Sequence, residues 1–406
     1  MPADAIVIRP GTAAEVAAAL KDASDGRQSL VIRGAGSKDG YGRQPSRIDV
    51  ILDMQRLNHI LAHEHGDMTA TIEAGASLRH VNVALALHGQ TLPLDPPFAD
   101  RATIGGLLAT NDSGPLRHRY GTPRDLVIGV QLATTDGTLA KAGGQVVKNV
   151  AGYDLSKLIA GSFGSIAAIV SATFKLAPRP AASKTLRIQV RDVEALAAIV
   201  RKVMASQLEP IAFEVVHRTV SHDDRRRLTA NDQRPATVVA LRFASLPIVV
   251  DTQIEQAAAA LQQWATSIEA LEGEAERSLW SAHATEVWDV PGAIVRASWL
   301  PTNVGDALGE LERHATGAHA AIFLTGRAAV GAGHIRIDGD NAAQATVVRQ
   351  LRTSPVFGNI VIVRGSPELK GSIDAWGSHG DRQLLFDSLK RAFDPNGTLN
   401  AGRGPL

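Results

Sequence analysis

The segment Leu30-Val-Ile-Arg-Gly-Ala-Gly-Ser-Lys38 connects a short apolar strand directly to a loop of small residues. Small residues let backbone N–H groups approach an anionic phosphate, so a nucleotide is the natural ligand of such a loop. The loop is not a dinucleotide fingerprint, because Asp39 takes the third glycine position and no helix opens there. It is not a P-loop either, because Gly-Lys-Ser/Thr does not occur. Taken alone, the loop is equally consistent with a tight turn after a strand.

Two further small-residue segments lie downstream. The first is Thr103-Ile-Gly-Gly-Leu-Leu-Ala-Thr-Asn-Asp-Ser-Gly114, in which the glycine pair leads into a short helix that could direct N–H groups towards a second phosphate. The second is Gly161-Ser-Phe-Gly-Ser-Ile166. Each segment alone is also explained as a turn between packed elements. Clustered in one domain, the loops favour a long cofactor with more than one phosphate.

The string Gly144-Gln-Val-Val-Lys-Asn-Val-Ala-Gly-Tyr-Asp-Leu155 is far more specific than any glycine pattern, and Lys157-Leu158 and Gly161-Ser-Phe-Gly164 follow it. With these residues the chain resembles the vanillyl-alcohol-oxidase-like (PCMH-type) FAD-binding proteins, specifically the E subunit of bacterial glycolate oxidase. The resemblance covers most of residues 8–180 and returns at the end of the chain. It implies FAD as cofactor and an α+β fold. That fold is a two-part PCMH-type FAD-binding domain followed by an α/β cap domain with an antiparallel sheet.

The resemblance also implies which residues contact FAD. In the family, the first loop wraps the pyrophosphate, the second lines pyrophosphate, ribityl chain and flavin, and the strand after the last turn supplies the final contacts. Carried over onto this sequence, the implied contacts are Arg33, Gly34, Ala35, Gly36, Ser37, Lys38, Pro96, Thr103, Ile104, Gly105, Gly106, Asn111, Ser113, Gly114, Ile166, Ala168 and Ile169.

The sequence departs from the family pattern in two places. Many relatives carry a Glu in the last turn and a Gly three residues past it, where this chain has Phe163 and then Ala167. With an aromatic residue at position 163, the sequence resembles the E subunit more than the catalytic D subunit. Some relatives attach the flavin through a His of the first loop. Residues 33–38 contain no His and the chain contains no Cys, so the resemblance implies non-covalent FAD.

The histidines bear on catalysis and on metal binding. D-type relatives carry paired C-terminal histidines for a metal and the substrate; this chain lacks them, and we expect no metal site. Oxidation of a 2-hydroxy acid needs a cation for the carboxylate and a base for the hydroxyl. Arg336 and His334, on one side of a probable strand, are the catalytic candidates. A core His beside a solvated Arg explains that pair as well. His63 and His65 are expected in a loop before Gly66.

Length and composition indicate two folded units of an ordinary globular protein. A single hydrophobic core rarely grows beyond about 250–300 residues, so a chain of 406 residues is expected to form two units. Glycine-rich loops give way at Pro178-Arg-Pro180 to strands and long Ala/Leu helices, expected at residues 192–205 and 251–271. We therefore predict an FAD-binding domain over residues 1–180, a cap or substrate domain over 181–375, and a C-terminal segment over 376–406. The last segment resembles the family's closing motif, which returns to the flavin domain.

Charge and hydropathy limit the partners. The formal net charge is +1, which implies no nucleic-acid partner, and Arg225, Arg226 and Arg227 are best explained as a solvated loop. The N-terminus has neither a basic nor an apolar signal region, and no apolar run approaches the roughly 20 residues of a membrane span. We expect a cytoplasmic protein, or one peripheral to the inner membrane through its partners. The cysteine count of zero excludes disulfides, thiolate nucleophiles and cysteine-held iron–sulfur clusters within this chain.

The missing cysteines bear on electron flow. A reduced flavin here has no iron–sulfur exit in the same chain, so its electrons must leave to another subunit, a soluble acceptor or oxygen. The resemblance implies an FAD-binding subunit of a glycolate oxidase or dehydrogenase complex, which oxidises glycolate to glyoxylate. Its role would be flavin electron transfer or assembly, with a D-type FAD catalytic subunit and an iron–sulfur subunit as partners. Two alternatives remain: a self-sufficient FAD-dependent 2-hydroxy acid oxidoreductase, and a structural subunit that has lost FAD.

Overall fold

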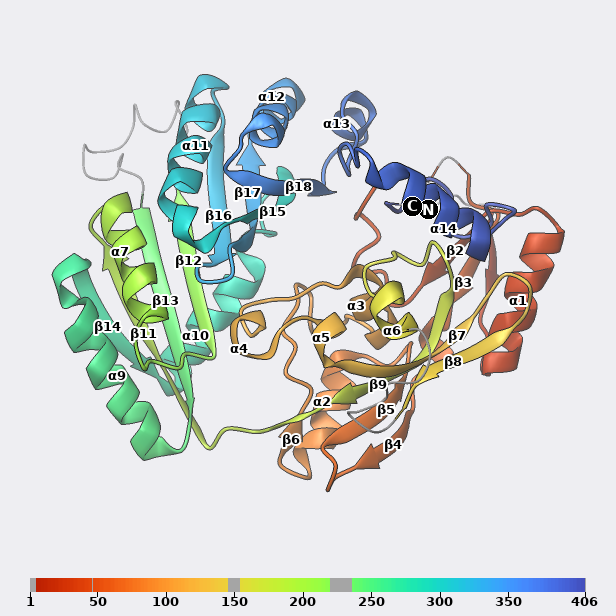
Figure 1. Ribbon diagram of the computed structural model, residues 1–406, viewed down its shortest axis with the longest axis horizontal. Helices are drawn as coiled ribbons and strands as arrows, with labels where there is room; N and C mark the ends of the chain where they lie inside the picture. Colours follow the sequence, from red (N-terminus) through yellow and green to blue (C-terminus); the bar gives the residue numbers. More distant parts are fainter. Residues whose placement is uncertain (1–4, 46, 145–153, 220–235, 406) are drawn as a thin grey trace. The chain divides into compact units, whose positions relative to one another are not determined.

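The computed structural model describes residues 5–45, 47–144, 154–219 and 236–405 (Figure 1). These residues form two compact units. Unit 1 comprises the described parts of Met1–Gly114, Tyr120–Arg179 and Ser378–Leu406, and unit 2 those of Pro115–Arg119 and Pro180–Gly377. The assignment of an FAD-binding domain, a cap domain and a C-terminal segment stays a prediction. Residues 145–153, which form most of the string that carries the family resemblance, and the arginines at 225–227 lie outside the described residues.

Unit 1 contains two main sheets and a short ribbon. The three-stranded sheet has the order β1-β3-β2 and is parallel, and the five-stranded sheet has the order β4-β5-β9-β7-β8 and is antiparallel; β10 pairs with β6. The elements are β1 (Ile6–Ile8), α1 (Ala13–Asp25), β2 (Leu30–Arg33), β3 (Val50–Asp53), β4 (Ile60–Glu64), β5 (Thr69–Glu73), α2 (Leu78–Ala86), β6 (Gln90–Thr91), α3 (Ile104–Thr110), α5 (Pro123–Leu126), β7 (Val127–Ala133), β8 (Leu139–Gly143), α6 (Leu155–Ile159), β9 (Ala168–Lys175), β10 (Ala177–Pro178) and α14 (Arg382–Phe393).

Helix α1 packs between the two main sheets of unit 1. Its start follows from the sequence, because the Thr12 hydroxyl accepts a hydrogen bond from Glu15 N at 3.2 Å and caps the first turn. Val16 and Leu20 on its apolar face are fully buried, in a core that holds Leu52 of β3 and Val170 of β9. Full burial of such a side chain contributes about 1.5–3 kcal/mol, so this helix stabilises the contact between the sheets.

The C-terminal segment joins the strand that precedes the first glycine loop. Leu399 forms a parallel bridge with Leu30 of β2. Leu30 N donates to Thr398 O and Asn400 N donates to Leu30 O, both at 2.8 Å. Asp394 shapes the preceding turn by accepting from the backbone N–H groups of Thr398 (2.9 Å) and Leu399 (2.7 Å). Residues at the end of the chain are thereby held beside the Gly34–Lys38 loop.

Unit 2 is built on one antiparallel sheet of the order β14-β11-β13-β12-β16-β17-β15-β18. Its two faces are covered by different helices: Lys184 of β11 pairs with Asp251 of α9, whereas the neighbouring Thr185 points the other way and bonds Glu276 of α10. The elements are α4 (Arg117–Tyr120, all but its last residue), β11 (Ala182–Val190), α7 (Val193–Met204), β12 (Ala212–Arg218), β13 (Ala236–Ser245), α9 (Pro247–Leu261), β14 (Ala265–Glu272), α10 (Gly273–Thr285), β15 (Ala293–Trp299), α11 (Val304–Gly317), β16 (Ala321–Arg327), β17 (Ala332–Asp338), α12 (Asn341–Thr353), β18 (Phe357–Arg364) and α13 (Pro367–Ser372).

The α+β class and the antiparallel second sheet are confirmed. Short apolar runs bounded by turn residues predict strands at Leu30–Arg33, Val50–Asp53 and Thr69–Glu73, and the structure has strands with these bounds. The helix expected over residues 251–271 is wrong at its end. The helix stops at Leu261, and Ala265–Glu272 is the edge strand β14. Pairing with β11 over this whole strand outweighs the helix preference of its Ala, Leu and Glu residues.

Within the described ranges, no helix combines the length and the apolar character that crossing a membrane requires.

Candidate cofactor site

Unit 1 contains a cleft lined by all three small-residue segments that the sequence singles out. The first contributes Arg33–Asp39, the second Thr103, Gly105 and Gly106, and the third Phe163 and Gly164. Asn400 and Arg403 of the C-terminal segment complete the wall, and apolar residues such as Ile32, Ala74 and Ile169 form the remainder. Loops that lie far apart in the chain therefore meet around one space.

The first two loops touch so closely that only glycine fits between them. A Cβ on Gly34 would lie 2.2 Å from Thr103 Oγ1, and a Cβ on Gly105 would lie 2.8 Å from the Ala74 Cβ. Gly36 has a φ of +72°, in the left-handed region that favours glycine. The glycines thus bring the backbone, rather than side chains, to the wall of the cleft, where its N–H groups can face an anion.

Among the described residues of this wall, guanidinium groups outnumber carboxylates. Arg33 Nη2 lies 2.8 Å from Asp39 Oδ2, and Arg403 Nη2 donates to the Lys38 carbonyl oxygen at 2.7 Å. Burial lowers the pKa of the Arg403 guanidinium, an effect that Asp39 opposes and Arg33 adds to, and a guanidinium nonetheless stays charged. Two cations beside one carboxylate give the positive excess that a diphosphate requires.

Lys38 holds the first loop in place instead of adding to this charge. Its Nζ lies 2.9 Å from Asp112 Oδ2 and donates to the Pro97 carbonyl oxygen at 3.2 Å, and the Tyr41 hydroxyl donates to the same carboxylate oxygen at 3.2 Å. The side chains of Lys38 and Asp112 are only 8% and 2% exposed. This buried ion pair fastens the first loop to the segment that follows α3.

The third loop is strained and is held by the end of the chain. Phe163 has a φ of +55°, unusual for a residue with a side chain, and its N–H donates to Ala109 O at 2.8 Å. The Asn400 side-chain amide donates to the Phe163 carbonyl oxygen. Asn400 Oδ1 is buried and accepts no hydrogen bond from the described protein atoms, so it is suited to accept one from a ligand.

The structure divides the residues implied by the family resemblance into two groups. Ten of them line the cleft: Arg33, Gly34, Ala35, Gly36, Ser37, Lys38, Thr103, Gly105, Gly106 and Ile169. Outside its lining lie Pro96, Ile104, Asn111, Ser113, Gly114, Ile166 and Ala168.

The second group has structural neighbours of its own. The side chains of Ile104 and Ile166 lie in one hydrophobic core and that of Ala168 in another. Asn111 Oδ1 accepts from Arg124 N at 3.0 Å, and a Cβ on Gly114 would lie 1.9 Å from Asp95 O. Contacts from these positions to the cofactor stay predictions.

Sequence reasoning left several cleft residues unassigned. Four of them could have been found from the sequence. Asn400 and Arg403 belong to the closing motif, and Phe163 and Ala167 are the departures from the family pattern. Three more, Ala109, Thr110 and Gly164, lie within the small-residue segments but were not named as contacts, and Ile32 and Asp39 flank the first loop. No comparable signal marks Met54 and Ala74, which come from neighbouring elements.

The proposed catalytic pair lies on β17 of unit 2. Arg336 is engaged by Asp338, with Nε–Oδ1 at 2.8 Å and Nη2–Oδ2 at 3.3 Å, and it also donates to the Glu286 carbonyl oxygen at 2.9 Å. His334 is buried, with its ring centroid 5.3 Å from that of Trp288. A catalytic role for the pair stays a prediction. His63 is not a loop residue as expected, since it belongs to β4, whereas His65 lies in the turn that follows.

Taken together, the cleft fits a long cofactor with a diphosphate and a polar ring system. Glycine backbone and two guanidiniums suit the diphosphate, the unsatisfied Asn400 Oδ1 suits a ring N–H, and Ile32, Ala74 and Ile169 offer apolar surface.

The chain is similar to known flavoproteins in sequence and to solved structures in fold. Residues 4–143 match the family model described as "FAD binding domain". The chain is 35% identical over 193 residues to glycolate oxidase subunit GlcE of Escherichia coli (strain K12), covering 47% of this chain and 53% of that protein. It is 32% identical over 208 residues to glycolate oxidase subunit GlcD of Bacillus subtilis (strain 168), covering 51% and 44%. The chain thus spans about half the length of these relatives.

One curated match extends over almost the whole chain. An uncharacterized FAD-linked oxidoreductase of Mycobacterium tuberculosis (strain ATCC 25618 / H37Rv) is 26% identical over 430 residues, covering 98% of this chain and 90% of that protein. Among solved structures, p-cresol methylhydroxylase with substrate bound has a TM-score of 0.77 at 14% identity, covering 98% of this chain and 88% of that one. That likeness shows the fold. Residues 4–143 therefore carry an FAD-binding domain, the chain shares the fold of p-cresol methylhydroxylase, and FAD is its cofactor.

Proposed function

We propose that this chain is the E-type FAD-binding subunit of a glycolate oxidase complex and acts in flavin electron transfer or assembly. The observation that carries the proposal is the likeness to GlcE of Escherichia coli, in a chain that has no cysteine. Its partners would be a D-type FAD subunit, which oxidises glycolate to glyoxylate, and an iron–sulfur subunit. A chain without cysteine needs such a partner if its electrons are to reach an iron–sulfur cluster.

The residues of the cleft have distinct tasks in this proposal. FAD, when bound, supplies a group that accepts and releases electrons. Arg33, Arg403 and the backbone of Gly34–Lys38 would hold its diphosphate by charge and hydrogen bonds. Asn400 would orient the cofactor through its unsatisfied oxygen. The first loop lacks His and the chain lacks Cys, so we propose that the FAD is non-covalent.

A second candidate function is favoured by a cavity in unit 2. A space of about 600 Å³ lies between α10 and the sheet strands β11 to β14, and Arg187, Arg218 and His283 line it. His283 Nε2 lies 3.0 Å from Glu214 Oε2, and the two side chains are 9% and 1% exposed. A carboxylate behind an imidazole orients it as a general base, and a guanidinium suits a substrate carboxylate. These groups would serve a self-sufficient FAD-dependent 2-hydroxy acid oxidoreductase.

A reduction experiment separates the candidate functions. We would purify the chain alone and together with its D-type and iron–sulfur partners, count flavin and iron, and follow flavin absorbance under anaerobic conditions with glycolate or D-lactate. The subunit role predicts bound flavin that glycolate bleaches only in the complex. Bleaching in the isolated chain would instead support self-sufficient oxidation. A colourless chain that releases no flavin on denaturation would mean a structural subunit without cofactor.

A further inference from the structure

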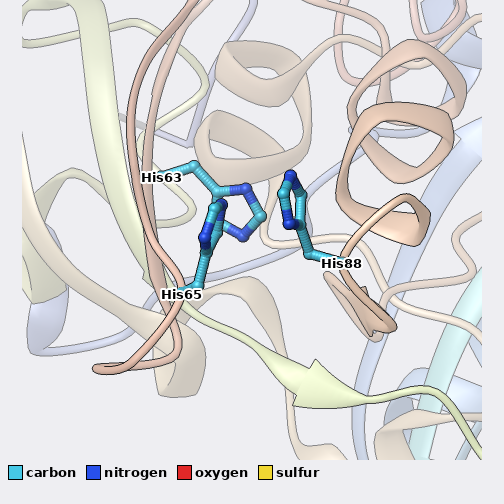
Figure 2. A group of neighbouring side chains, drawn as sticks. All are labelled: His63, His65 and His88. Carbon is cyan, nitrogen blue, oxygen red and sulfur yellow. The ribbon is translucent and has the colours of Figure 1, made fainter.

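Three histidines meet on unit 1 outside the cleft residues. His63 lies near the end of β4, His65 in the turn towards β5, and His88 in the turn after α2. Figure 2 shows the three rings facing one another, two from the β4 side and one from the end of the helix. Their ligand nitrogens all lie within 4.8 Å of one another. Residues from two separate elements are thus brought to one point.

One of the three imidazoles is already oriented. His63 Nε2 lies 2.7 Å from Gln90 Oε1, and the buried Gln90 donates from its Nε2 to the His65 carbonyl oxygen at 2.9 Å. A hydrogen bond from Nε2–H to the amide oxygen leaves His63 Nδ1 with a lone pair. Metal-binding histidines are commonly fixed in this way, through the ring nitrogen that does not bind the metal.

The remaining two imidazoles can move. His65 and His88 are exposed, and their rings are stacked with centroids 3.7 Å apart. Nitrogens bound to one tetrahedral zinc ion are about 3.4 Å apart, given a Zn–N distance of about 2.0–2.1 Å. Binding would therefore require these two exposed side chains to rotate so that their nitrogens come closer than the present limit of 4.8 Å. Burial of apolar surface does not explain why exposed imidazoles gather here.

We propose that His63, His65 and His88 bind one divalent transition-metal ion of the Zn²⁺ type, with water completing the coordination. Three neutral imidazoles suit zinc and its neighbours, whereas Ca²⁺ and Mg²⁺ require oxygen ligands. The sequence alone predicts no metal site, and the proposal departs from that prediction. A bound ion would connect the β4–β5 turn to the end of α2 and hold this edge of unit 1 together.

Zinc binding to the full chain, purified with its flavin, tests the proposal. After removal of metal with a chelator, equilibrium dialysis against ZnCl₂ should give one tightly bound Zn²⁺ per chain. His65→Asn and His88→Asn should each weaken binding about tenfold or more, and the double variant should abolish it. His80→Asn is the matched control, because His80 is an exposed histidine of α2, the helix that precedes His88, and lies outside the cluster. Its zinc affinity should equal that of the parent chain.

Two results would overturn the proposal: no Zn²⁺ bound by the parent chain beyond the level of the double variant, or a tight site that survives in the double variant. Exposed positions were chosen so that folding is preserved. Flavin content and the far-UV circular dichroism of each variant should match those of the parent. The readout is bound metal rather than activity, so the test does not depend on the proposed function.

Discussion

The cleft of unit 1 and the cavity of unit 2 both have arginines in their walls, but they balance that charge differently. In the cleft, Arg33 pairs with Asp39, the one carboxylate among the described lining residues, and the charge of Asp39 also acts on Arg403; glycine backbone forms much of the wall. In the cavity, Arg218 pairs with Glu286, and Arg187 lies 3.7 Å from Glu269. A positive excess suits a permanently charged diphosphate, whereas a balanced wall must exchange partners to bind an anion. The difference indicates that unit 1 is the part built to hold the cofactor.

Breaking the buried pair behind the first loop should have the largest effect. Lys38→Met removes one partner of a buried ion pair with Asp112, so we expect the free energy of unfolding to fall by about 3–5 kcal/mol and the flavin to be lost. Urea unfolding and flavin absorbance per chain measure both. The double variant Lys38→Met/Asp112→Leu should recover part of the stability. An unchanged midpoint in the single variant would show that the pair does not fasten the loop.

Filling the contact between the first two loops should come next. Gly34→Ala places a methyl group 2.2 Å from Thr103 Oγ1, so the loops must separate, which we expect to cost about 1–3 kcal/mol and to lower FAD affinity more than tenfold. Flavin release followed by fluorescence measures the affinity. Gly40→Ala is the matched control, because its added Cβ meets nothing within 4 Å. Equal flavin content in the two variants would contradict a glycine-built wall.

Removing one guanidinium from the cleft tests whether its positive charge binds the diphosphate. Arg403→Met deletes a donor to the Lys38 carbonyl oxygen and one of the two cations, so FAD affinity should fall by about 1.5–3 kcal/mol, or roughly tenfold to a hundredfold. Riboflavin, which has no phosphate, should bind the parent and the variant with similar affinity. A similar loss for both ligands would assign Arg403 to folding of the site instead of diphosphate binding.

The smallest effect on flavin should come from the cavity of unit 2. Arg218→Met removes a cation that is held by Glu286 and whose pKa is lowered by burial and by Arg336, and we expect FAD content within experimental error of the parent. If the chain oxidises a 2-hydroxy acid by itself, this variant should raise KM for the acid about tenfold. Steady-state rates with glycolate and D-lactate check it. Loss of flavin from this variant would contradict the assignment of cofactor binding to the cleft of unit 1 alone.

Much of the cofactor site could be predicted because glycine acts through the backbone. The loop from Gly34 to Lys38, the Gly105–Gly106 pair and the closing motif near Asn400 are visible as short local strings, and all of them have residues in the cleft. Three strands of unit 1 could also be predicted from local sequence, because their apolar runs are bounded by turn residues. The end of α9 could not be predicted in this way, because pairing with β11 decides that Ala265–Glu272 is a strand.

By itself, the sequence determined that the chain has three glycine-containing loops and no cysteine, and its resemblance to a family of flavoproteins implied FAD and an α+β fold. Only the tertiary structure decided which side chains meet. Lys38 reaches Asp112, Asn400 reaches the carbonyl of Phe163, and His88 reaches His63, although each pair is distant in sequence. The physical reason is that backbone conformation follows from neighbouring residues, whereas an ion pair or a ligand set depends on how separate elements pack.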